Sequence, residues 1–248
     1  MPDIMLLRSL LPHTPVLAPE ETVSTNSDAR IWLQSGAAHG SLVVADRQTA
    51  GRGRMGRSFS SQAGGLYMSL VLKSHQPAGV LTTLCAVAVR RAVIQLTGKT
   101  PGIKWVNDLQ LNGKKICGIL CEGVWEGDQL LGVIAGIGLN ICQREFPEAL
   151  RDIAASLYPE GISPIAPERF AAAIHRQIMA LLLSAPGHME EYRQACVTLG
   201  RRVTWQGQDG PREGLALDVD DTGALIIDAG GGRLCLGAGE VSIKTQND

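Results

Sequence analysis

The stretch "GIKWVNDLQLNGKKICGILCEG", residues 102–123, carries the strongest structural signal in the chain. Its pair Asn112-Gly113 lies between two alternating runs, which is the pattern of a two-residue hairpin turn. The apolar run at 129–141 follows and predicts the next strand of the same sheet. This stretch therefore places a β-sheet near the middle of the chain.

Helix and strand signals surround this hairpin. Before it, a helix is expected at 24–36, with Ser24 or Thr25 as its capping residue and Gly36 at its end. The other expected elements are strands at 41–46 and 64–72 and helices at 80–98, 167–184 and 189–196. His175 lies on one of these helices, where we expect a structural role. The pattern predicts an α+β fold with a mixed central sheet flanked by helices.

The character of the chain changes after Gly200. Short strands and turns follow, including a turn at Asp221-Thr222-Gly223. We therefore expect a larger domain over residues 1–198 and a small β-barrel or sandwich over residues 199–248. With 248 residues, the chain is long enough for both.

Composition and charge argue against several classes of function. Charged residues make up 19% of the chain, and the net charge of −1 provides no basic field to hold nucleic acid. Aromatic residues make up 4%, which is too few for a base-stacking platform. We recognise no signal peptide and no apolar run long enough to span a membrane. We therefore expect neither nucleic acid nor a membrane as a partner.

Six cysteines are scattered through mostly apolar segments, at positions 85, 117, 121, 142, 196 and 235. Neither the cysteines nor the five histidines have the spacing of metal ligands, so we expect no metal site built from them. Buried, reduced thiols are the better interpretation. They indicate a protein of the reducing cytoplasm.

The segment "QTAGRGRMGRSF", residues 48–59 and called the arginine loop below, combines cations with hinges. It holds arginines at 52, 54 and 57 and glycines at 51, 53 and 56. The glycines disfavour a stable helix or regular strand. The loop can bind an anion such as a nucleotide, because guanidinium groups bind phosphate in a bidentate way. It lacks the Walker pattern, and a solvated surface turn is the alternative.

Two further features are candidates for chemistry. Lys104 stands in an apolar neighbourhood, where it is either a fixed charge aimed at a phosphate or carboxylate, or a lysine that reaches out to water. "GIGLN", residues 136–140, lets a ligand approach the backbone and offers Asn140 as a polar contact, although strand glycines also mark bulges. Motifs for a covalent nucleophile and for dinucleotide binding are missing, so catalysis would depend on electrostatics and positioning.

Together these motifs resemble the biotin–protein ligases. The shared blocks are "STN" (24–26), "QTAGRGRMGR" (48–57), "GGLYMSL" (64–70), "KWVNDL" (104–109), "KKICGILCE" (114–122) and "GIGLN" (136–140). The match is strong over about residues 20–142, and "DDTGALII" and "GAGEVSI" in the tail fit the family's small C-terminal SH3-like barrel. The resemblance implies a class II synthetase/ligase-like fold.

The resemblance also implies a reaction and its participants. Biotin and ATP, with Mg²⁺ present, give biotinyl-5′-AMP, and a lysine of a biotin carboxyl carrier protein, such as that of acetyl-CoA carboxylase, then accepts the biotin. By matching position, the biotin site comprises Ser24, Thr25, Asn26, Gln48, Arg52, Gly53, Arg54 and Lys104. The nucleotide contacts are Arg52, Arg54 and Asn140, and the catalytic pair is Lys104 and Arg54.

The chain departs from the family pattern at two positions. Val106 replaces the usual proline of K-W-P-N-D, and Phe59 replaces the usual tryptophan, which puts the approach to Lys104 and the packing of the loop in doubt. About 20 residues precede "STN", too few for the DNA-binding helix-turn-helix of some members, so we expect no repressor activity.

Two rival functions and one structural question stay open. A lipoate or octanoate ligase shares the fold and the adenylation chemistry. A non-catalytic ligase-like module that binds partners through its tail is the second rival, although the retained Lys104 and Arg54 argue against it. The sequence does not decide between a monomer and a homodimer formed through sheet edges.

Overall fold

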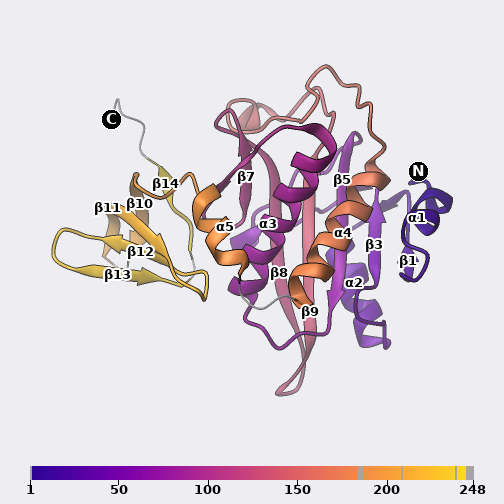
Figure 1. Cartoon of the computed structure of the whole chain (residues 1–248), viewed down its shortest axis with the longest axis horizontal. Helices are drawn as coiled ribbons and strands as arrows, with labels where there is room; N and C mark the ends of the chain where they lie inside the picture. The colour runs from indigo at the N-terminus through magenta and orange to yellow at the C-terminus, as the bar shows by residue number, and fades with distance from the viewer. Residues whose placement is uncertain (1, 184–186, 208, 238, 244–248) are drawn as a thin grey trace.

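The computed structural model describes residues 2–183, 187–207, 209–237 and 239–243 (Figure 1). A seven-stranded sheet with the order β1-β3-β5-β9-β8-β7-β6 forms its centre. The strands are β1 (Val16–Leu17), β3 (Leu42–Ala45), β5 (Gly65–Leu72), β6 (Gly102–Lys104), β7 (Asp108–Leu111), β8 (Lys114–Glu126) and β9 (Gln129–Asn140). The sheet is mixed, as predicted, because β1 pairs with β3 in parallel and the other neighbours are antiparallel.

The hairpin predicted at Asn112-Gly113 is confirmed. Both residues have positive φ, 52° and 77°, and they connect β7 to β8. Positive φ at both central positions is the geometry of a type I′ turn, whose twist matches that of the flanking strands. Gly113 adopts it without a Cβ penalty, and asparagine tolerates it better than most residues.

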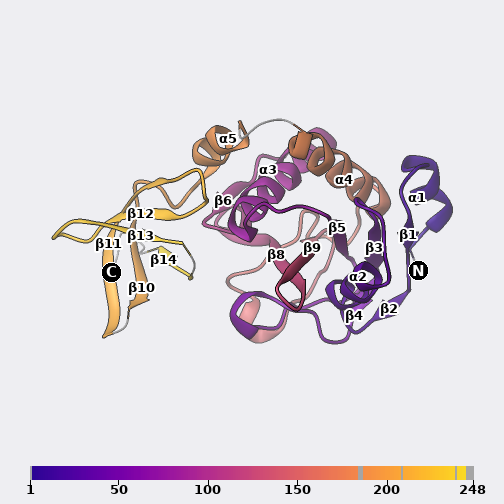
Figure 2. The same ribbon diagram turned by 90° about the horizontal axis from the view of Figure 1, so that it is seen from below.

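Helices cover both faces of the sheet (Figure 2). One face carries α3 (Ala78–Thr97), α4 (Pro167–Leu183) and α5 (His188–Ala195), and the other carries α2 (Thr25–Gln34). These four helices confirm the predicted ones, although the expected end at residue 184 lies outside the described residues. Ser24 is the N-cap residue of α2, but its side chain makes no capping hydrogen bond. An additional helix, α1 (Ile4–Leu10), precedes the sheet.

Alternation along β9 decides which face is free for a site. Val133, Ala135, Ile137 and Leu139 point into the main core with α3 and α4, and Ile134 joins a second, smaller core beneath α2. Strand residues alternate between faces, so positions 136 and 138 share the α2 face with Ile134. Both are glycines, so β9 projects no side chain from these two positions on the α2 face, next to the small core.

Helix α3 is long and apolar enough to cross a membrane by length and composition. Within the fold, more than half of it is buried. It packs against α4, α5 and β8, so its apolar surface contributes to the core of this domain. His175 of α4 is also buried, with Nε2 2.9 Å from the carbonyl oxygen of Gly40, which confirms its structural role.

Residues 202–243 form a separate antiparallel sheet with the order β13-β12-β11-β10-β14. Its strands are β10 (Arg202–Gly207), β11 (Gly210–Val219), β12 (Leu225–Asp228), β13 (Arg233–Leu236) and β14 (Ser242–Ile243). The expected small β unit is therefore present, but pairings among the described residues leave β13 and β14 as open edges. Trp105 attaches this sheet to the larger one, because its Nε1 donates to the carbonyl oxygen of Gly223 over 2.9 Å.

All six cysteines are free thiols. The expectation that they are buried is wrong for Cys235, because exposed and half-buried residues alternate along β13 and Cys235 lies on the exposed side. Cys121 and Cys142 are half-buried, whereas burial raises the pKa of the Cys117 thiol well above its usual value. The buried thiols are therefore protonated and unreactive at neutral pH.

Candidate functional site

Two adjoining cavities lie beside the arginine loop. The large cavity has a volume of about 330 Å³ and the small cavity about 50 Å³. Five residues line both of them: Gly53, Arg54, Phe59, Asn107 and Lys115. A ligand with two chemically different halves could therefore occupy both cavities and bring their junction close to Lys115.

The floor of the small cavity is made of glycines at positions where a larger residue would clash with its neighbours. Gly118 of β8 and Gly138 of β9 are cross-strand partners, and Gly136 lies two residues before Gly138. A Cβ on Gly138 would lie 2.4 Å from Cε1 of Phe59, and one on Gly136 would lie 2.1 Å from Oδ1 of Asn26. The sequence led us to expect that "GIGLN" lets a ligand approach the backbone; in this structure the side chains of Asn26 and Phe59 lie against these glycines.

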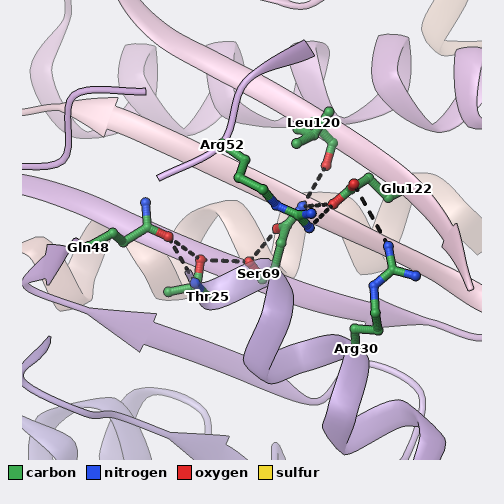
Figure 3. A network of polar contacts seen from close by, with 8 residues as sticks. Thr25, Arg30, Gln48, Arg52, Ser69, Leu120 and Glu122 are labelled. Atoms are coloured by element: carbon green, nitrogen blue, oxygen red, sulfur yellow. Dashed lines mark hydrogen bonds and ion pairs between the residues drawn. The ribbon is translucent and has the colours of Figure 1, made fainter. Parts of the chain in front are cut away.

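Polar side chains form the wall of the small cavity (Figure 3). Oε1 of Gln48 accepts hydrogen bonds from the backbone N–H of Thr25 at 2.8 Å and from its hydroxyl at 3.1 Å. The buried hydroxyl of Ser69 lies 2.8 Å from that of Thr25 and 2.7 Å from Oδ1 of Asn26. These bonds hold the wall rigid before any ligand arrives.

Ser24 differs from these neighbours. It is buried and lines the small cavity, yet its hydroxyl makes no hydrogen bond with the residues that the structure describes. A hydroxyl can both donate and accept. Ser24 is therefore free to bind a polar group of a ligand, and the structure brings together all four wall residues expected from the sequence: Ser24, Thr25, Asn26 and Gln48.

The arginine loop follows β4 (Arg47–Gln48) and is ordered by its own backbone. The N–H of Gly53 donates to the carbonyl oxygen of Arg57 over 2.7 Å, and that of Phe59 donates to Gly51 over 2.8 Å. Residues Arg54–Gly56 form a single short turn in which Met55 and Gly56 have positive φ, so its backbone is not that of a regular helix. This turn agrees with the expectation that the glycines disfavour a stable helix or regular strand in the loop.

The three loop arginines have different partners. Nη2 of Arg52 donates to Oε2 of Glu122 over 2.8 Å, and Arg57 pairs with Glu240, with Nη2 2.6 Å from Oε2. Among the described residues, the Arg54 side chain makes a single, longer hydrogen bond, 3.3 Å from Nη1 to Oδ1 of Asn107. Burial lowers the pKa of the Arg54 guanidinium, with Asp108 and Glu240 acting in the opposite direction. A partly desolvated cation of this kind favours an incoming anion.

Two lysines face the cavities, and the sequence argument selected only one of them. Lys104 lines the large cavity and makes no side-chain hydrogen bond or ion pair with the described residues. Lys115 lines both cavities, with Nζ 2.8 Å from Oδ1 of Asp108 and 5.7 Å from the centre of the Phe59 ring. The sequence argument missed Lys115 because its place in the site depends on strand register. Lys115 follows the Asn112-Gly113 turn, and the same strand continues to Gly118, which has no side chain.

The side chain of Asn140 is hydrogen-bonded within the protein, and Val106 lies in the core. The side chain of Asn140 lines the large cavity, but Nδ2 donates to the carbonyl oxygen of Ala155 over 3.1 Å and Oδ1 accepts from Gln143 over 3.2 Å. Val106 is buried, and its carbonyl oxygen accepts a bond from the hydroxyl of Tyr192 over 3.1 Å. Its departure from the family pattern therefore faces the core, whereas the Phe59 departure lies in the site.

Comparison with known proteins gives the same picture over most of the chain. Residues 20–140 match the Biotin/lipoate A/B protein ligase family, and residues 198–244 match the Biotin protein ligase C terminal domain. The chain therefore belongs to the biotin/lipoate A/B protein ligase family.

Individual relatives agree with this assignment. The chain is 37% identical over 227 residues to the bifunctional ligase/repressor BirA of Bacillus subtilis (strain 168), covering 84% of this chain and 68% of that protein. It is 33% identical to the biotin--[acetyl-CoA-carboxylase] ligase of Mycobacterium tuberculosis, covering 89% of this chain and 86% of that protein. The biotin protein ligase of Aquifex aeolicus, solved in complex with biotin and ATP, superposes with a TM-score of 0.80 at 28% identity, covering 93% of this chain and 98% of that chain.

Proposed function

We propose that this chain is a biotin–protein ligase. It activates biotin with ATP to biotinyl-5′-AMP and transfers the biotin to a specific lysine of a biotin carboxyl carrier protein. The observation that carries the proposal is the pair of adjoining cavities with Lys115 between them. The ligands and names of the relatives, biotin and ATP in one and acetyl-CoA carboxylase in another, support this choice of substrates.

The small cavity receives the ring system of biotin, and the free hydroxyl of Ser24 binds its polar end. The Phe59 ring already lies on the glycine floor of this cavity, where a Cβ on Gly138 would stand 2.4 Å from its Cε1. A bicyclic ring needs more space. The Phe59 ring and the arginine loop therefore move outward when biotin enters and close over it afterwards.

In the first step, a carboxylate oxygen of biotin attacks the α-phosphorus of ATP, and the bond from that phosphorus to the pyrophosphate oxygen breaks. Negative charge is redistributed over the phosphoryl oxygens in the transition state. Lys115 at the junction and Lys104 and Arg54 in the large cavity stabilise this charge from fixed positions. The chain thus needs no covalent nucleophile for this step.

Magnesium fits this site as a companion of the nucleotide. The structure shows no cluster of three or more metal-ligating side chains among its described residues. Mg²⁺ usually needs only one or two carboxylates in addition to substrate phosphates, and Asp108 and Asp152 both line the large cavity. When bound, the ion neutralises charge on the departing pyrophosphate.

In the second step, the neutral amine of the carrier lysine attacks the acyl carbon of biotinyl-5′-AMP. An amide bond forms, the bond from carbon to the AMP oxygen breaks, and the amine loses a proton to solvent. The acyl adenylate hydrolyses readily, so the arginine loop must exclude water until the carrier arrives. This requirement explains why cationic side chains stand on a loop with glycine hinges.

The organisation of the chain forms part of the same proposal. Residues 1–198 are the catalytic domain and residues 199–248 an SH3-like barrel, a division supported by the match of residues 198–244 to the family's C-terminal domain. The six free thiols support a cytoplasmic location. Lipoate or octanoate is the alternative acyl substrate, since the matched family includes ligases for lipoate.

ATP–pyrophosphate exchange tests the proposal. Purified protein with Mg²⁺ and ATP receives biotin, lipoate or octanoate in separate reactions. Exchange that depends on biotin alone is the expected result. Exchange with lipoate or octanoate would instead assign the chain to the sister activity. No exchange with any of the three acids, from a folded protein, would favour a non-catalytic binding module.

A further inference from the structure

Glu122 of β8 brings a carboxylate to the edge of the small cavity without lining it. Its Oε2 accepts hydrogen bonds from Nδ2 of Asn26 and from Nη2 of Arg52, both over 2.8 Å. Its Oε1 lies 3.8 Å from Nη2 of Arg30. Figure 3 shows the side chains of Arg30 and Arg52 converging on the Glu122 carboxylate. Helix α2, strand β8 and the arginine loop therefore meet at a single side chain.

The amide of Asn26 is almost fully used by the protein. Its Nδ2 donates to Glu122 and makes a second, longer contact of 3.4 Å with the carbonyl oxygen of Leu120. Its Oδ1 accepts from Ser69 over 2.7 Å. The residue is 5% exposed, so a broken bond would leave a polar group unpaired. Asn26 is thus held in one position in the wall, and Glu122 accepts the shorter of the two hydrogen bonds from its amide nitrogen.

The other partner of Glu122 holds the arginine loop. Arg52 immediately precedes Gly53 and Arg54, which line both cavities, and its backbone bridges to Ser58 across the loop. The start of the loop is held by a second set of bonds, since Nε2 of Gln48 donates to Oγ of Ser61 over 2.8 Å. The loop is therefore tied at Gln48 and again at Arg52.

We propose that Glu122 is a positioning residue of the adenylation site. Its carboxylate binds both Asn26 in the cavity wall and Arg52 in the loop, and so fixes the distance between the wall and the loop. The loop can then close over the acyl substrate in the correct position relative to the wall. The proposal deepens the proposed function and rests on it. Glu122 itself touches neither substrate.

The charge of Glu122 matters as well as its oxygen atoms. With the carboxylate in place, the guanidinium of Arg52 faces the sheet and is neutralised there. Without it, Arg52 becomes an unpaired cation beside the site and is drawn to the substrate phosphates. The loop would then close over the nucleotide with its backbone out of register with the wall. Both biotin affinity and retention of the adenylate should suffer.

The variant Glu122→Gln tests this. It keeps an oxygen that accepts from Asn26 but removes the charge that holds Arg52. Because hydrogen bonds to charged groups are the stronger ones, we expect the KM for biotin in pyrophosphate exchange to rise about tenfold. Release of free biotinyl-5′-AMP should rise several-fold, while the kcat for exchange stays within about twofold. Glu122→Ala, which loses both bonds, should show a larger effect on KM.

Glu126→Gln is the matched control, because Glu126 is an exposed glutamate on the same strand that lines neither cavity. It should leave all three parameters unchanged. A Glu122→Gln enzyme with wild-type KM and wild-type adenylate release would overturn the proposal. So would a uniform loss of activity that follows the fraction of folded protein, since this is the signature of a merely structural residue.

Direct binding of biotin, measured by calorimetry, separates this proposal from the proposed function. If the wild-type chain showed no biotin-dependent exchange, the proposed function would fail. Weaker biotin binding by Glu122→Gln than by Glu126→Gln would still support the positioning role of Glu122. Equal binding by the two variants would refute it.

Discussion

At the scale of single residues, the position of Lys115 determines how the site can work. Its ammonium group is the only lysine group that borders both cavities in the described part of the chain, and Asp108 holds it there at 2.8 Å. Lys104 lines the large cavity but not the small one, and no side chain or backbone group in the described part of the chain pairs with its ammonium group. Lys115 is therefore positioned where the carboxylate and the phosphate would react, and Lys104 is positioned to stabilise the negative charge of the phosphate.

The first prediction concerns these two lysines. Lys115→Ala and Lys104→Ala should each fold normally and lower the kcat for pyrophosphate exchange by about 100-fold, the usual cost of removing one preorganised charge-stabilising group. Lys114→Ala is the matched control, because Lys114 lines neither cavity and its Nζ donates to the carbonyl oxygen of Arg151. Near-normal turnover in either lysine variant would refute the role given to that residue.

Sequence reasoning found the residues of the wall but missed Lys115 and Glu122. Ser24, Thr25 and Gln48 stand in compact polar motifs, and an exposed loop rich in arginine is visible in any linear reading. Lys115 and Glu122 look like ordinary strand charges, since Lys115 follows another lysine after the turn and Glu122 ends an otherwise apolar run. Their importance depends on strand register, which brings Glu122 to Asn26 across 96 positions of the chain.

At the scale of elements, the arginine loop is the part that must move. Its residues carry the cations, and the proposed function requires it to open when a ligand enters. Met55 at its tip is 73% exposed, so little packing holds the tip down. A loop of this kind can protect a reactive adenylate and then release it to a carrier.

The second prediction tests this protective role. Arg54→Gly should loosen the closed loop and raise the amount of free biotinyl-5′-AMP in solution several-fold, detected by chromatography of the filtrate. Arg47→Gly provides the comparison, because Arg47 pairs with Glu20 and Glu21 outside both cavities. If Arg54→Gly released no more adenylate than the wild type, the loop would not be the barrier to escape.

The third prediction concerns the glycine floor formed by β8 and β9. A methyl group on Gly138 would lie 2.4 Å from Cε1 of Phe59 and 2.7 Å from Cζ, so the ring must shift. Gly138→Ala should cost about 1–3 kcal/mol of unfolding free energy by overpacking and weaken biotin binding. Gly231→Ala, where nothing lies within 4 Å of the added Cβ, should change neither in urea unfolding and calorimetry.

The elements themselves were largely predictable. The sheet strands from 41 onward, α2, α3 and the α4–α5 pair follow from periodicity, capping and the Asn112-Gly113 turn. The parallel pairing of β1 with β3 was not, because two-residue strands leave no periodic pattern. The short turn at Arg54–Gly56 in the arginine loop was also not predicted, because it places Met55 at positive φ, which is uncommon for residues other than glycine.

At the scale of the whole molecule, the C-terminal sheet borders the site. Gly239 and Glu240 line the large cavity, and Glu240 pairs with Arg57 across 183 positions of the chain. No local pattern could reveal such a contact. The sheet is also attached to the core of the larger domain through Trp105 and Gly223. The two parts should therefore respond together to changes that destabilise either.

The fourth prediction is a pH dependence of global stability. Burial lowers the pKa of His175 and of His188 below the usual 6.5. The unfolded chain therefore takes up protons at these residues before the folded chain does, and stability falls as pH drops below about 6.5. Urea unfolding between pH 7.5 and about 5 should show this fall, and His175→Gln with His188→Gln should make it shallower. An unchanged slope in the double variant would contradict the assignment.

The most direct measurement is a crystal structure of this chain with biotinyl-5′-AMP bound. The account predicts the biotin rings in an enlarged small cavity against Ser24, the adenosine in the large cavity, and Nζ of Lys115 within hydrogen-bonding distance of the acyl phosphate. Arg52 should still contact Glu122 beneath the closed loop. An adenylate bound elsewhere, or one whose acyl phosphate lies far from Lys115, would contradict the account.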